Sequence, residues 1–477
     1  MAMVASGTAS VEHESDLVIR ALQGLQSASP GDRVSVAHAV KRLRIPLPFD
    51  IAPQLHSLLI DPAINPRKIE RAGWMLLMAA GRLPAGDPEA VAHWLEGDDL
   101  ARALLSQSHV TLEGVERVLT RLRRWLLLDE RASEFPRSVA ALVAQAAHNA
   151  GAWLIDAEEM AYLKSYDGVL RAAYLPDPPA ERQTPEYDDP VTRAVAAQYN
   201  AWPYPAWQRG MAGQGESFTQ VIGAIAPDAP QGLPENARML IAGCGTGLQA
   251  VNWAQRFPQL SITAIDISAG ALDYAMARSP SSLTNLHFHQ CDLHHAGRFG
   301  TFDAIVVTGV LHHLPCPEKG WAALTRLLNP GGIMRVMLYS ALARLPVRAC
   351  QARIADLARL PVDDDLLRAV RARLIAGQPN DVTRSPDFFH LGGVHDLLLH
   401  RHEEVFDVPR IQRALGALNL KLLRVRLPQR EAKSYRATYP LDRYCRDFLT
   451  WAAFERTHPR TFAGMYDFWC CNAPCSG

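Results

Sequence analysis

Several residues with hydrogen-bonding or acid–base side chains follow directly after short apolar segments of the chain. Glycines allow a backbone to approach a ligand closely, carboxylates accept hydrogen bonds from hydroxyl and amino groups, and imidazoles exchange protons near neutral pH. The residues in these positions are Gly243, Gly245, Gly247, Asp266, Asp292, His312 and His313. Their types suit a site that binds a polar ligand and moves a proton.

These residues require a sheet that brings their segments together. Apolar segments alternate with helix-like patterns from Arg238 onward, which predicts an α/β fold with parallel strands. The predicted strands are 238–242, 261–266, 286–290, 302–307 and 333–339. In open sheets of this kind, ligands bind at the carboxyl ends of the strands. Amide groups at the start of the helix after the glycines are expected to face the ligand.

The same segments resemble the motifs of the class I S-adenosylmethionine-dependent methyltransferases. IAGCGTG is similar to the first motif of that family, AID to the acidic end of its second strand, and QCD to the end of its third. VVTGVLHHL resembles the fourth strand and NPGG the turn into the fifth. The resemblance covers residues 238–339 and implies a Rossmann-like, seven-stranded sheet flanked by helices, with S-adenosylmethionine as the cofactor.

The resemblance also assigns roles to individual residues. It implies that Asp266 meets the ribose hydroxyls of the cofactor and that Asp292 meets the adenine. The full set of implied cofactor-binding residues is Gly243, Cys244, Gly245, Gly247, Asp266, Ile267, Asp292, Leu293 and Thr308. Many family members have an acidic residue where this chain has Ala242. A nicotinamide enzyme is disfavoured because Leu248 stands where its third glycine would be.

Methyl transfer from a sulfonium requires alignment, exclusion of water and, for some acceptors, removal of a proton. The candidate catalytic residues are His313, Tyr339 and His395. A purely structural role for His312 and His313 is the alternative. The fourth strand does not continue as Asn/Asp-Pro-Pro-Tyr, which disfavours methylation of nucleic acid bases and leaves a small molecule or a protein side chain.

Beyond Tyr339 the chain is longer than a minimal methyltransferase. An arginine-rich helical insertion at about 341–385 is a candidate lid, and it precedes a segment with four histidines: His390, His395, His400 and His402. Their spacing matches no recognised zinc pattern, so we predict no metal. They are either part of a substrate-binding lid or solvated loop residues. A sixth strand over 420–427 and a seventh, antiparallel strand near the end complete the predicted sheet.

The first third of the chain has apolar residues at helical spacing and no strand-like alternation. It predicts an all-helical domain over 1–174, a proline-rich linker over 175–190 and a methyltransferase domain over 191–477. This order resembles a bacterial subgroup with a helical, sometimes tetratricopeptide-containing, N-terminal region. The basic residues Arg121, Arg123 and Arg124 are interpreted as a solvated helix face.

An aromatic segment follows the linker. Its residues, Tyr199, Trp202, Tyr204 and Trp207, lie around two prolines. They either bind the substrate or pack one domain against the next.

Composition excludes several classes of protein. Lys plus Arg and Asp plus Glu both number 49, so no net charge draws the chain to nucleic acid. No segment approaches the roughly 20 apolar residues that span a bilayer. The eight cysteines lack paired spacing, which favours reduced thiols and a cytoplasmic location.

We therefore expect an S-adenosylmethionine-dependent methyltransferase of a small-molecule or protein substrate, with no membrane partner and nucleic acid disfavoured. The helical domain is a candidate docking site for a protein partner. The alternative is a subunit or sensor that binds the cofactor without catalysis and docks a partner through the helical domain.

Overall fold

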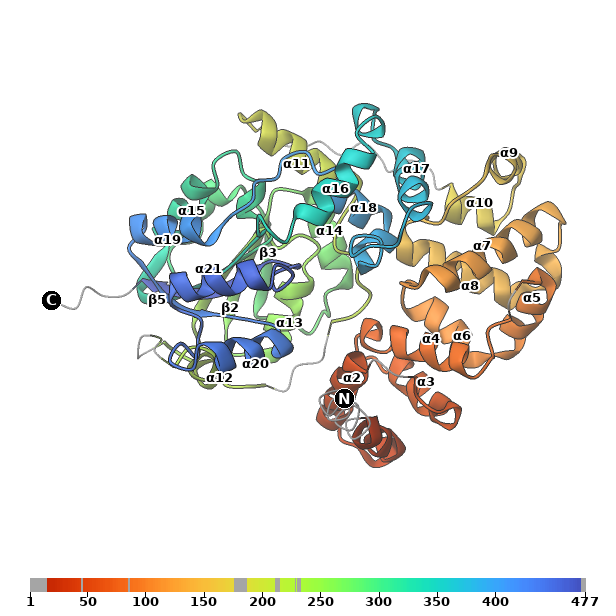
Figure 1. Ribbon diagram of the computed structural model, residues 1–477, viewed down its shortest axis with the longest axis horizontal. Helices are drawn as coiled ribbons and strands as arrows, with labels where there is room; N and C mark the ends of the chain where they lie inside the picture. Colours follow the sequence, from red (N-terminus) through yellow and green to blue (C-terminus); the bar gives the residue numbers. More distant parts are fainter. Residues whose placement is uncertain are drawn as a thin grey trace. The chain divides into compact units, whose positions relative to one another are not determined.

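The computed structural model describes residues 15–43, 46–84, 86–175, 187–210, 215–227, 229 and 233–472. These residues form two compact units, each with its own core (Figure 1). The first contains the described residues up to 175, residues 206–210 and Ile354–Leu397; the second contains the remaining described residues. Among the described residues, no helix is both long and apolar enough to cross a membrane.

The first unit is entirely helical. Its α-helices before the linker are α2 (Pro30–Arg42), α3 (Ala52–Ile60), α4 (Glu70–Ala79), α5 (Pro88–Gly97), α6 (Asp99–Gln107), α7 (Glu113–Leu128), α8 (Pro136–Asn149), α9 (Ala157–Ser165) and α10 (Val169–Tyr174). Buried leucines recur along α7 at helical spacing, as the sequence predicts. The expectation of an all-helical N-terminal region is confirmed.

One arginine of α7 differs from its predicted environment. Arg123 is fully buried, and its Nε donates to Glu159 of α9 at 3.0 Å. The prediction of a solvated basic face is therefore wrong for Arg123, although Arg121 is exposed. A buried guanidinium is tolerated here because a carboxylate neutralises its charge.

Part of the predicted insertion belongs to this helical unit. The segment Ile354–Leu397 contributes α17 (Asp364–Ile375), which lies within the predicted insertion, and most of α18 (Leu391–Leu398), which lies in the histidine segment that follows it. Arg371 of α17 is buried, and its Nη2 lies 2.8 Å from Oε2 of Glu116 on α7. Arg368 donates to the carbonyl of Gly151 at 2.8 Å. These contacts join segments more than 200 residues apart in the sequence.

The second unit contains a seven-stranded sheet. Its strands are β1 (Arg238–Ala242), β2 (Ser261–Asp266), β3 (Leu286–Gln290), β4 (Phe302–Thr308), β5 (Leu328–Leu338), β6 (Leu420–Val425) and β7 (Tyr466–Asn472). The order across the sheet is β3-β2-β1-β4-β5-β7-β6. Strands β1 to β5 are parallel, and β7 pairs antiparallel with both β5 and β6. The predicted seven-stranded α/β sheet is confirmed.

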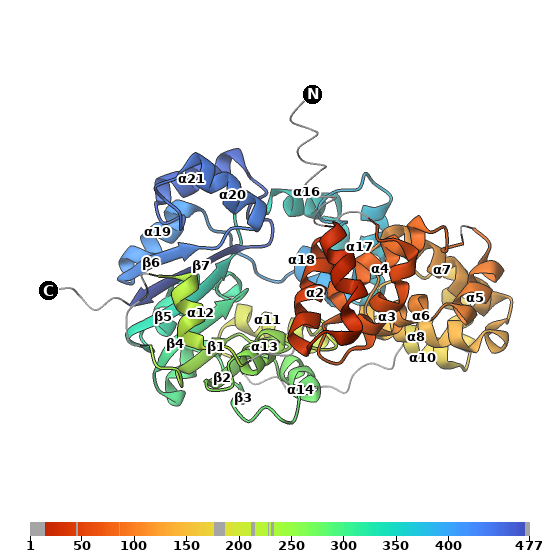
Figure 2. The same ribbon diagram turned by 90° about the horizontal axis from the view of Figure 1, so that it is seen from below.

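Helices cover both faces of this sheet (Figure 2). On one face, Trp321 of α15 (Pro317–Thr325), Ile411 of α19 (Val408–Ala417) and Trp451 of α21 (Phe448–Thr457) join the core. On the other, Trp253 of α13 (Leu248–Arg256) packs against Trp469 of β7, with ring centroids 6.3 Å apart. The remaining α-helices of this unit are α11 (Pro190–Ala201), α12 (Phe218–Ile225), α14 (Ala269–Arg278), α16 (Leu345–Arg353) and α20 (Gln429–Thr438).

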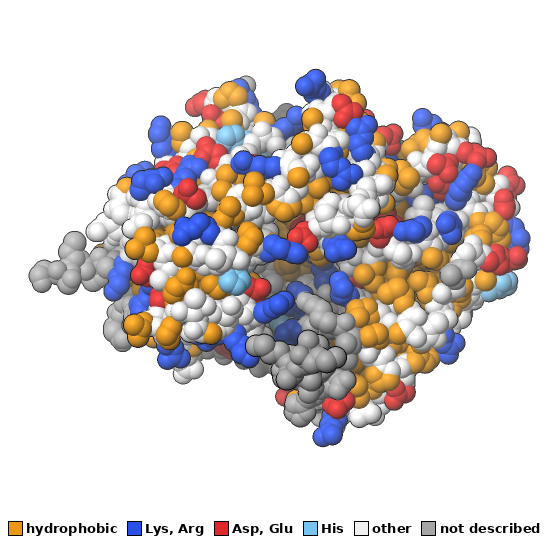
Figure 3. All heavy atoms as spheres, viewed as in Figure 1, with side chains coloured by type: hydrophobic (Ala, Val, Ile, Leu, Met, Phe, Trp, Pro, Cys, Tyr) orange, Lys and Arg blue, Asp and Glu red, His pale blue; other side chains and the backbone are white. Residues whose placement is uncertain are grey.

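Charged side chains of both signs are interspersed on the face shown in Figure 3. This distribution agrees with equal numbers of acidic and basic residues in the chain.

Candidate functional site

The glycine loop connects β1 to α13. Gly243, Gly245 and Gly247 have φ values of +69°, +52° and +82°, which other residues rarely adopt. A Cβ atom on Gly243 would lie 2.2 Å from Cγ2 of Val310. Glycine is therefore favoured at position 243 for two reasons: its backbone conformation, and the close packing of the loop after β1 against Val310, which follows β4.

Hydrogen bonds hold the glycine loop on the end of β2. The amides of Gly243 and Cys244 both donate to the carbonyl of Ile265, at 2.8 and 2.9 Å, and the amide of Gly245 donates to Asp266 Oδ2 at 2.7 Å. These three amides are thus used within the protein and fix the shape of the loop. The sequence predicts the loop but not this internal use of its amides.

Asp266 is nearly buried at the carboxyl end of β2. Its second carboxylate oxygen accepts the amide of Ser268 at 2.9 Å. Burial raises the pKa of Asp266, while the amide hydrogen bonds act in the opposite direction. Each carboxylate oxygen has two lone pairs, so Asp266 can still accept a hydroxyl group of a ligand.

Asp292 lies at the end of the neighbouring strand, β3. Its Oδ1 caps the short helix that follows by accepting the amide of His294 at 2.8 Å. The predicted contact residues Ile267 and Leu293 directly follow Asp266 and Asp292 in the chain. The ends of β2 and β3 are adjacent because Asp266 pairs with Gln290 in the sheet. Both carboxylates thus lie at the carboxyl ends of adjacent strands of the sheet.

Tyr187 joins this edge, although the sequence interpretation places it in the linker. Its hydroxyl donates to the carbonyl of Ile267 at 2.8 Å. Burial, together with the charge of Asp292, raises the pKa of Tyr187 to about 12. No sequence motif marks this residue, because its isolated position among prolines gives no periodic pattern.

At the end of β4, several polar atoms lack partners. Thr308 Oγ1 and both ring nitrogens of His312 are buried without a hydrogen bond to any residue that the structure describes. Burial lowers the pKa of His312 well below its ordinary value, so its imidazole is neutral. Buried polar atoms without partners are rare in proteins, and they favour a bound ligand or water at this place.

His313 has a defined tautomer. Its Nδ1 lies 2.9 Å from the carbonyl oxygen of His402, which can only accept, so Nδ1 carries the proton and Nε2 carries the lone pair. Burial lowers the pKa of His313 to about 3. The ring is therefore neutral at physiological pH, and its Nε2 lone pair can accept a hydrogen bond.

His400 stacks on His313, with ring centroids 3.6 Å apart. Its Nδ1 accepts the amide of His402 at 3.1 Å, so the neutral ring carries its proton on Nε2, which lies 3.3 Å from the Tyr199 hydroxyl. Tyr199 is a predicted substrate-binding residue. His400 is among the four histidines that the sequence singles out, but its pairing with His313 could not be predicted from spacing.

Tyr339, which follows β5, closes the other side of this cluster. Its ring lies 4.0 Å from that of His312, and the Arg344 guanidinium lies over it at 4.1 Å. Arg344 also forms an ion pair with Glu403. Of the three predicted catalytic residues, the second unit thus brings His313 and Tyr339 together on either side of His312.

The other predicted residues have different surroundings. Trp202 and Tyr204 are half-buried in the second unit, and the carbonyl of Tyr204 faces Gly245. Trp207 and His395 belong to the helical unit, where both are buried. His390 is also buried there, so the interpretation of all four histidines as solvated loop residues is wrong.

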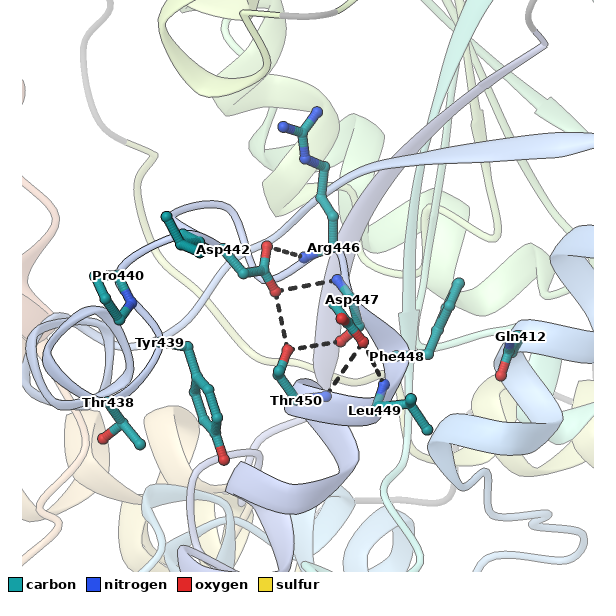
Figure 4. A pocket seen from close by; sticks show the side chains of 11 residues that line it. Gln412, Thr438, Tyr439, Pro440, Asp442, Arg446, Asp447, Phe448, Leu449 and Thr450 are labelled. Atoms are coloured by element: carbon teal, nitrogen blue, oxygen red, sulfur yellow. Dashed lines mark hydrogen bonds between the residues drawn. The ribbon is translucent and has the colours of Figure 1, made fainter.

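A pocket of about 870 Å³ lies elsewhere in the second unit (Figure 4). It is formed by Gln412 of α19 and residues 438–450 around the start of α21. Asp442 is bound there by the amides of Arg446 and Asp447 and by the Thr450 hydroxyl. No predicted site residue lines this pocket, so it is separate from the edge at which Asp266 and His313 lie.

Comparison with known proteins supports the assignment of the sheet domain. Residues 240–334 match the family model described as a methyltransferase domain. Together with the strand order, this match identifies the second unit as a class I S-adenosylmethionine-dependent methyltransferase domain.

Individual relatives match over part of their length. An uncharacterized Synechococcus protein is 40% identical over 177 residues, which are 35% of this chain and 42% of that protein. The trans-aconitate 2-methyltransferase of Deinococcus radiodurans is 35% identical over 127 residues, 26% of this chain and 47% of that enzyme. The chain thus spans less than half the length of these relatives.

A solved structure, PKMT2 from Rickettsia typhi in complex with AdoHcy, covers 57% of this chain and 56% of its own, with 18% identity and a TM-score of 0.42.

Proposed function

We propose that this protein transfers a methyl group from S-adenosylmethionine to a small molecule or a protein side chain. One observation carries the proposal: within a methyltransferase domain, the glycine loop, Asp266 and the neutral His313 are all positioned by the carboxyl ends of β1, β2 and β4. That edge is where open α/β sheets bind their ligands.

The residues at this edge fit the cofactor. Asp266 can accept the ribose hydroxyls, and Asp292 has one carboxylate oxygen without a hydrogen bond to the described residues for an amino group of adenine. The unpartnered hydroxyl of Thr308 is available to the methionine part. When bound, the cofactor supplies an activated methyl group on a sulfonium centre.

The protein's own residues then have a limited set of tasks. His313 can take the proton of a hydroxyl or thiol acceptor at Nε2 while the methyl group is transferred, because the acceptor becomes strongly acidic at that point and the Nδ1 proton is held by the His402 carbonyl. The rings of His312 and Tyr339, which follow β4 and β5, pack against each other, and we assign them the task of limiting the access of bulk water to the reacting atoms. Within the sheet unit, the acceptor is expected to contact Tyr199, Trp202 or Tyr204. The roles expected for Trp207 and His395, which belong to the helical unit, stay predictions from the sequence.

Calorimetric titration with S-adenosylhomocysteine tests the proposal. The wild-type chain is expected to bind, and Asp266→Ala is expected to bind at least about tenfold more weakly, because a charged hydrogen-bond acceptor is lost. The matched control is Asp303→Ala, at the amino end of β4, where the carboxylate bonds to Arg238 and Asn329. Absence of binding by the wild type, or equal binding by the Asp266 variant, contradicts the proposal.

The acceptor can be sought directly. Metabolites and proteins from cells with and without the gene are compared by mass spectrometry for a species that differs by one methyl group. If the protein binds S-adenosylhomocysteine but no such species exists, the alternative of a non-catalytic cofactor-binding subunit, with the helical unit docking a protein partner, replaces the catalytic proposal.

A further inference from the structure

Residues 187–205, which we call the strap, lie outside the matched methyltransferase region. They are attached to the carboxyl ends of β1 and β2, where the predicted cofactor-binding residues lie. The strap consists of Tyr187, α11 and the turn that ends at Pro205. Asp189 caps α11 by accepting the amide of Thr192 at 2.8 Å, and Arg193 donates to the carbonyl of Tyr187 at 2.7 Å. The start of α11 therefore fixes the backbone of Tyr187.

The other end of the strap is fixed as well. Asn200 Oδ1 accepts the Ser268 hydroxyl at 2.8 Å and the amide of Gly270 at 3.0 Å, just beyond β2. Thr246 of the glycine loop donates to the carbonyl of Pro205 at 2.6 Å. Each attachment is to a loop that leaves β1 or β2, so the strap is positioned by the elements that hold the predicted cofactor-binding residues.

Tyr187 lies near both Asp266 and Asp292, at the adjacent carboxyl ends of β2 and β3. Its hydroxyl shares the Ile267 carbonyl with the Gln290 side chain, which donates to the same oxygen at 3.1 Å. Burial is the main cause that raises the pKa of the phenol to about 12, and the charges of Asp292 and Asp266 act in the same direction. The hydroxyl is therefore protonated at every physiological pH and remains a donor. The ring is half-buried, so part of it is accessible.

We propose that Tyr187 is an adenosine-binding residue whose ring covers the adenosine of the cofactor between Asp266 and Asp292. The inference rests on the proposed function and adds a residue that neither the sequence motifs nor the matched region contains. Aromatic side chains bind nucleobases because every base presents a π face to them. Fixing the hydroxyl to Ile267 and the backbone to Arg193 orders the ring before the ligand arrives, which lowers the entropy cost of binding.

Titration calorimetry of the full chain tests this role with two probes, S-adenosylhomocysteine and 5′-methylthioadenosine, which lacks the amino-acid part. Tyr187→Ala and Tyr187→Leu are expected to weaken binding of both probes at least about tenfold and by similar factors, because the stacking ring is lost. Tyr187→Phe keeps the ring and loses one hydrogen bond, so its binding is expected to remain within about fivefold of the wild type. Tyr444→Ala, an aromatic truncation beside Arg424 and Arg446, is the matched control and is expected to bind normally.

The outcomes separate this inference from the proposed function. If a thermal unfolding measurement shows that Tyr187→Ala is misfolded, the affinities of Tyr187→Leu and Tyr187→Phe are compared instead to test whether the ring binds adenosine. Wild-type affinity in the Leu variant, or a loss for S-adenosylhomocysteine without a loss for 5′-methylthioadenosine, overturns the role of Tyr187 and leaves the proposed function intact. A wild-type chain that binds neither probe overturns both.

Discussion

Backbone groups of one short segment determine the protonation pattern of two stacked histidines. The carbonyl of His402 holds the proton of His313 on Nδ1, and the amide of the same residue leaves His400 with its proton on Nε2. The adjoining amide of Glu404 donates to the carbonyl of His312 at 2.8 Å. Residues 400–404 thus fix the tautomers of both rings through backbone hydrogen bonds alone, as the proton-accepting role proposed for His313 requires.

The lowered pKa of His313 predicts a dependence of stability on pH. The folded state keeps this imidazole neutral down to about pH 3, whereas in the unfolded chain it binds a proton near its ordinary pKa of 6.5. The unfolded state therefore binds more protons between these values, and stability is lost as the pH falls below about 6.5. Acidification from pH 8 to pH 4.5 lowers the free energy of unfolding of both proteins. We expect this decrease to be about 2–3 kcal/mol smaller in His313→Gln than in the wild type.

Urea unfolding of both proteins at pH 8 and at pH 4.5 measures this difference. At pH 8 the imidazole is neutral in both states, so the comparison there isolates the packing cost of the substitution. Equal losses of unfolding free energy on acidification would show that His313 is protonated in the folded protein and is not the neutral base proposed above.

The sequence predicts residues best where a strand ends. Asp266, Asp292 and His313 follow apolar segments, and each was placed at the sheet edge from that pattern alone. Tyr187 and His400 lie in segments without periodicity, and their partners, Ile267 and His313, are 80 and more residues away. The buried state of Arg123 depends similarly on Glu159, which no local pattern pairs with it.

Among the secondary-structure elements, the strands were predicted well because a buried strand flanked by turns has a strong local pattern. The sequence does not predict the packing of α17, because its partner is α7 and the two helices are far apart in the sequence. Glu116 accepts two hydrogen bonds from Arg371, whose Nε donates to the carbonyl of Phe388 at 2.7 Å. The arginine-rich pattern that suggested a lid thus includes a buried ion pair of the helical unit.

Removing one partner of this ion pair should destabilise the helical unit. Glu116→Gln leaves the buried guanidinium of Arg371 without a neutralising charge, and we expect a loss of about 3–5 kcal/mol in the free energy of unfolding. Chemical denaturation followed by circular dichroism measures the change. Glu113→Gln on the same helix, which breaks a partly exposed pair with Arg117, is the control and should cost less than about 1 kcal/mol.

A stability loss in Glu116→Gln no larger than that of Glu113→Gln would contradict a structural role for the ion pair. The double variant Glu116→Leu/Arg371→Leu removes both charges and should recover part of the loss, since no unpaired charge stays buried.

At the scale of the whole molecule, the chain leaves the methyltransferase domain and later returns to it. Ile354–Leu397 belongs to the helical unit, while Arg353 and Leu398 on either side belong to the sheet unit. The two ends of this excursion are close together, because the side chain of Gln351 donates to the carbonyl of Leu398 at 3.2 Å. The methyltransferase domain is therefore nearly continuous across the inserted segment.

This geometry predicts which shortened chain folds. A chain of residues 187–477 with 354–397 replaced by a short Gly-Ser linker should fold and bind S-adenosylhomocysteine, because the strap and all strands remain and the linker has little distance to span. The same chain with 354–397 retained exposes Arg371, whose guanidinium is buried and paired with Glu116 of α7 in the full protein. Limited proteolysis should cut the chain that retains 354–397 within that segment and leave the chain with the Gly-Ser linker intact. Resistance of residues 354–397 to the protease would show that this segment folds without the N-terminal helices.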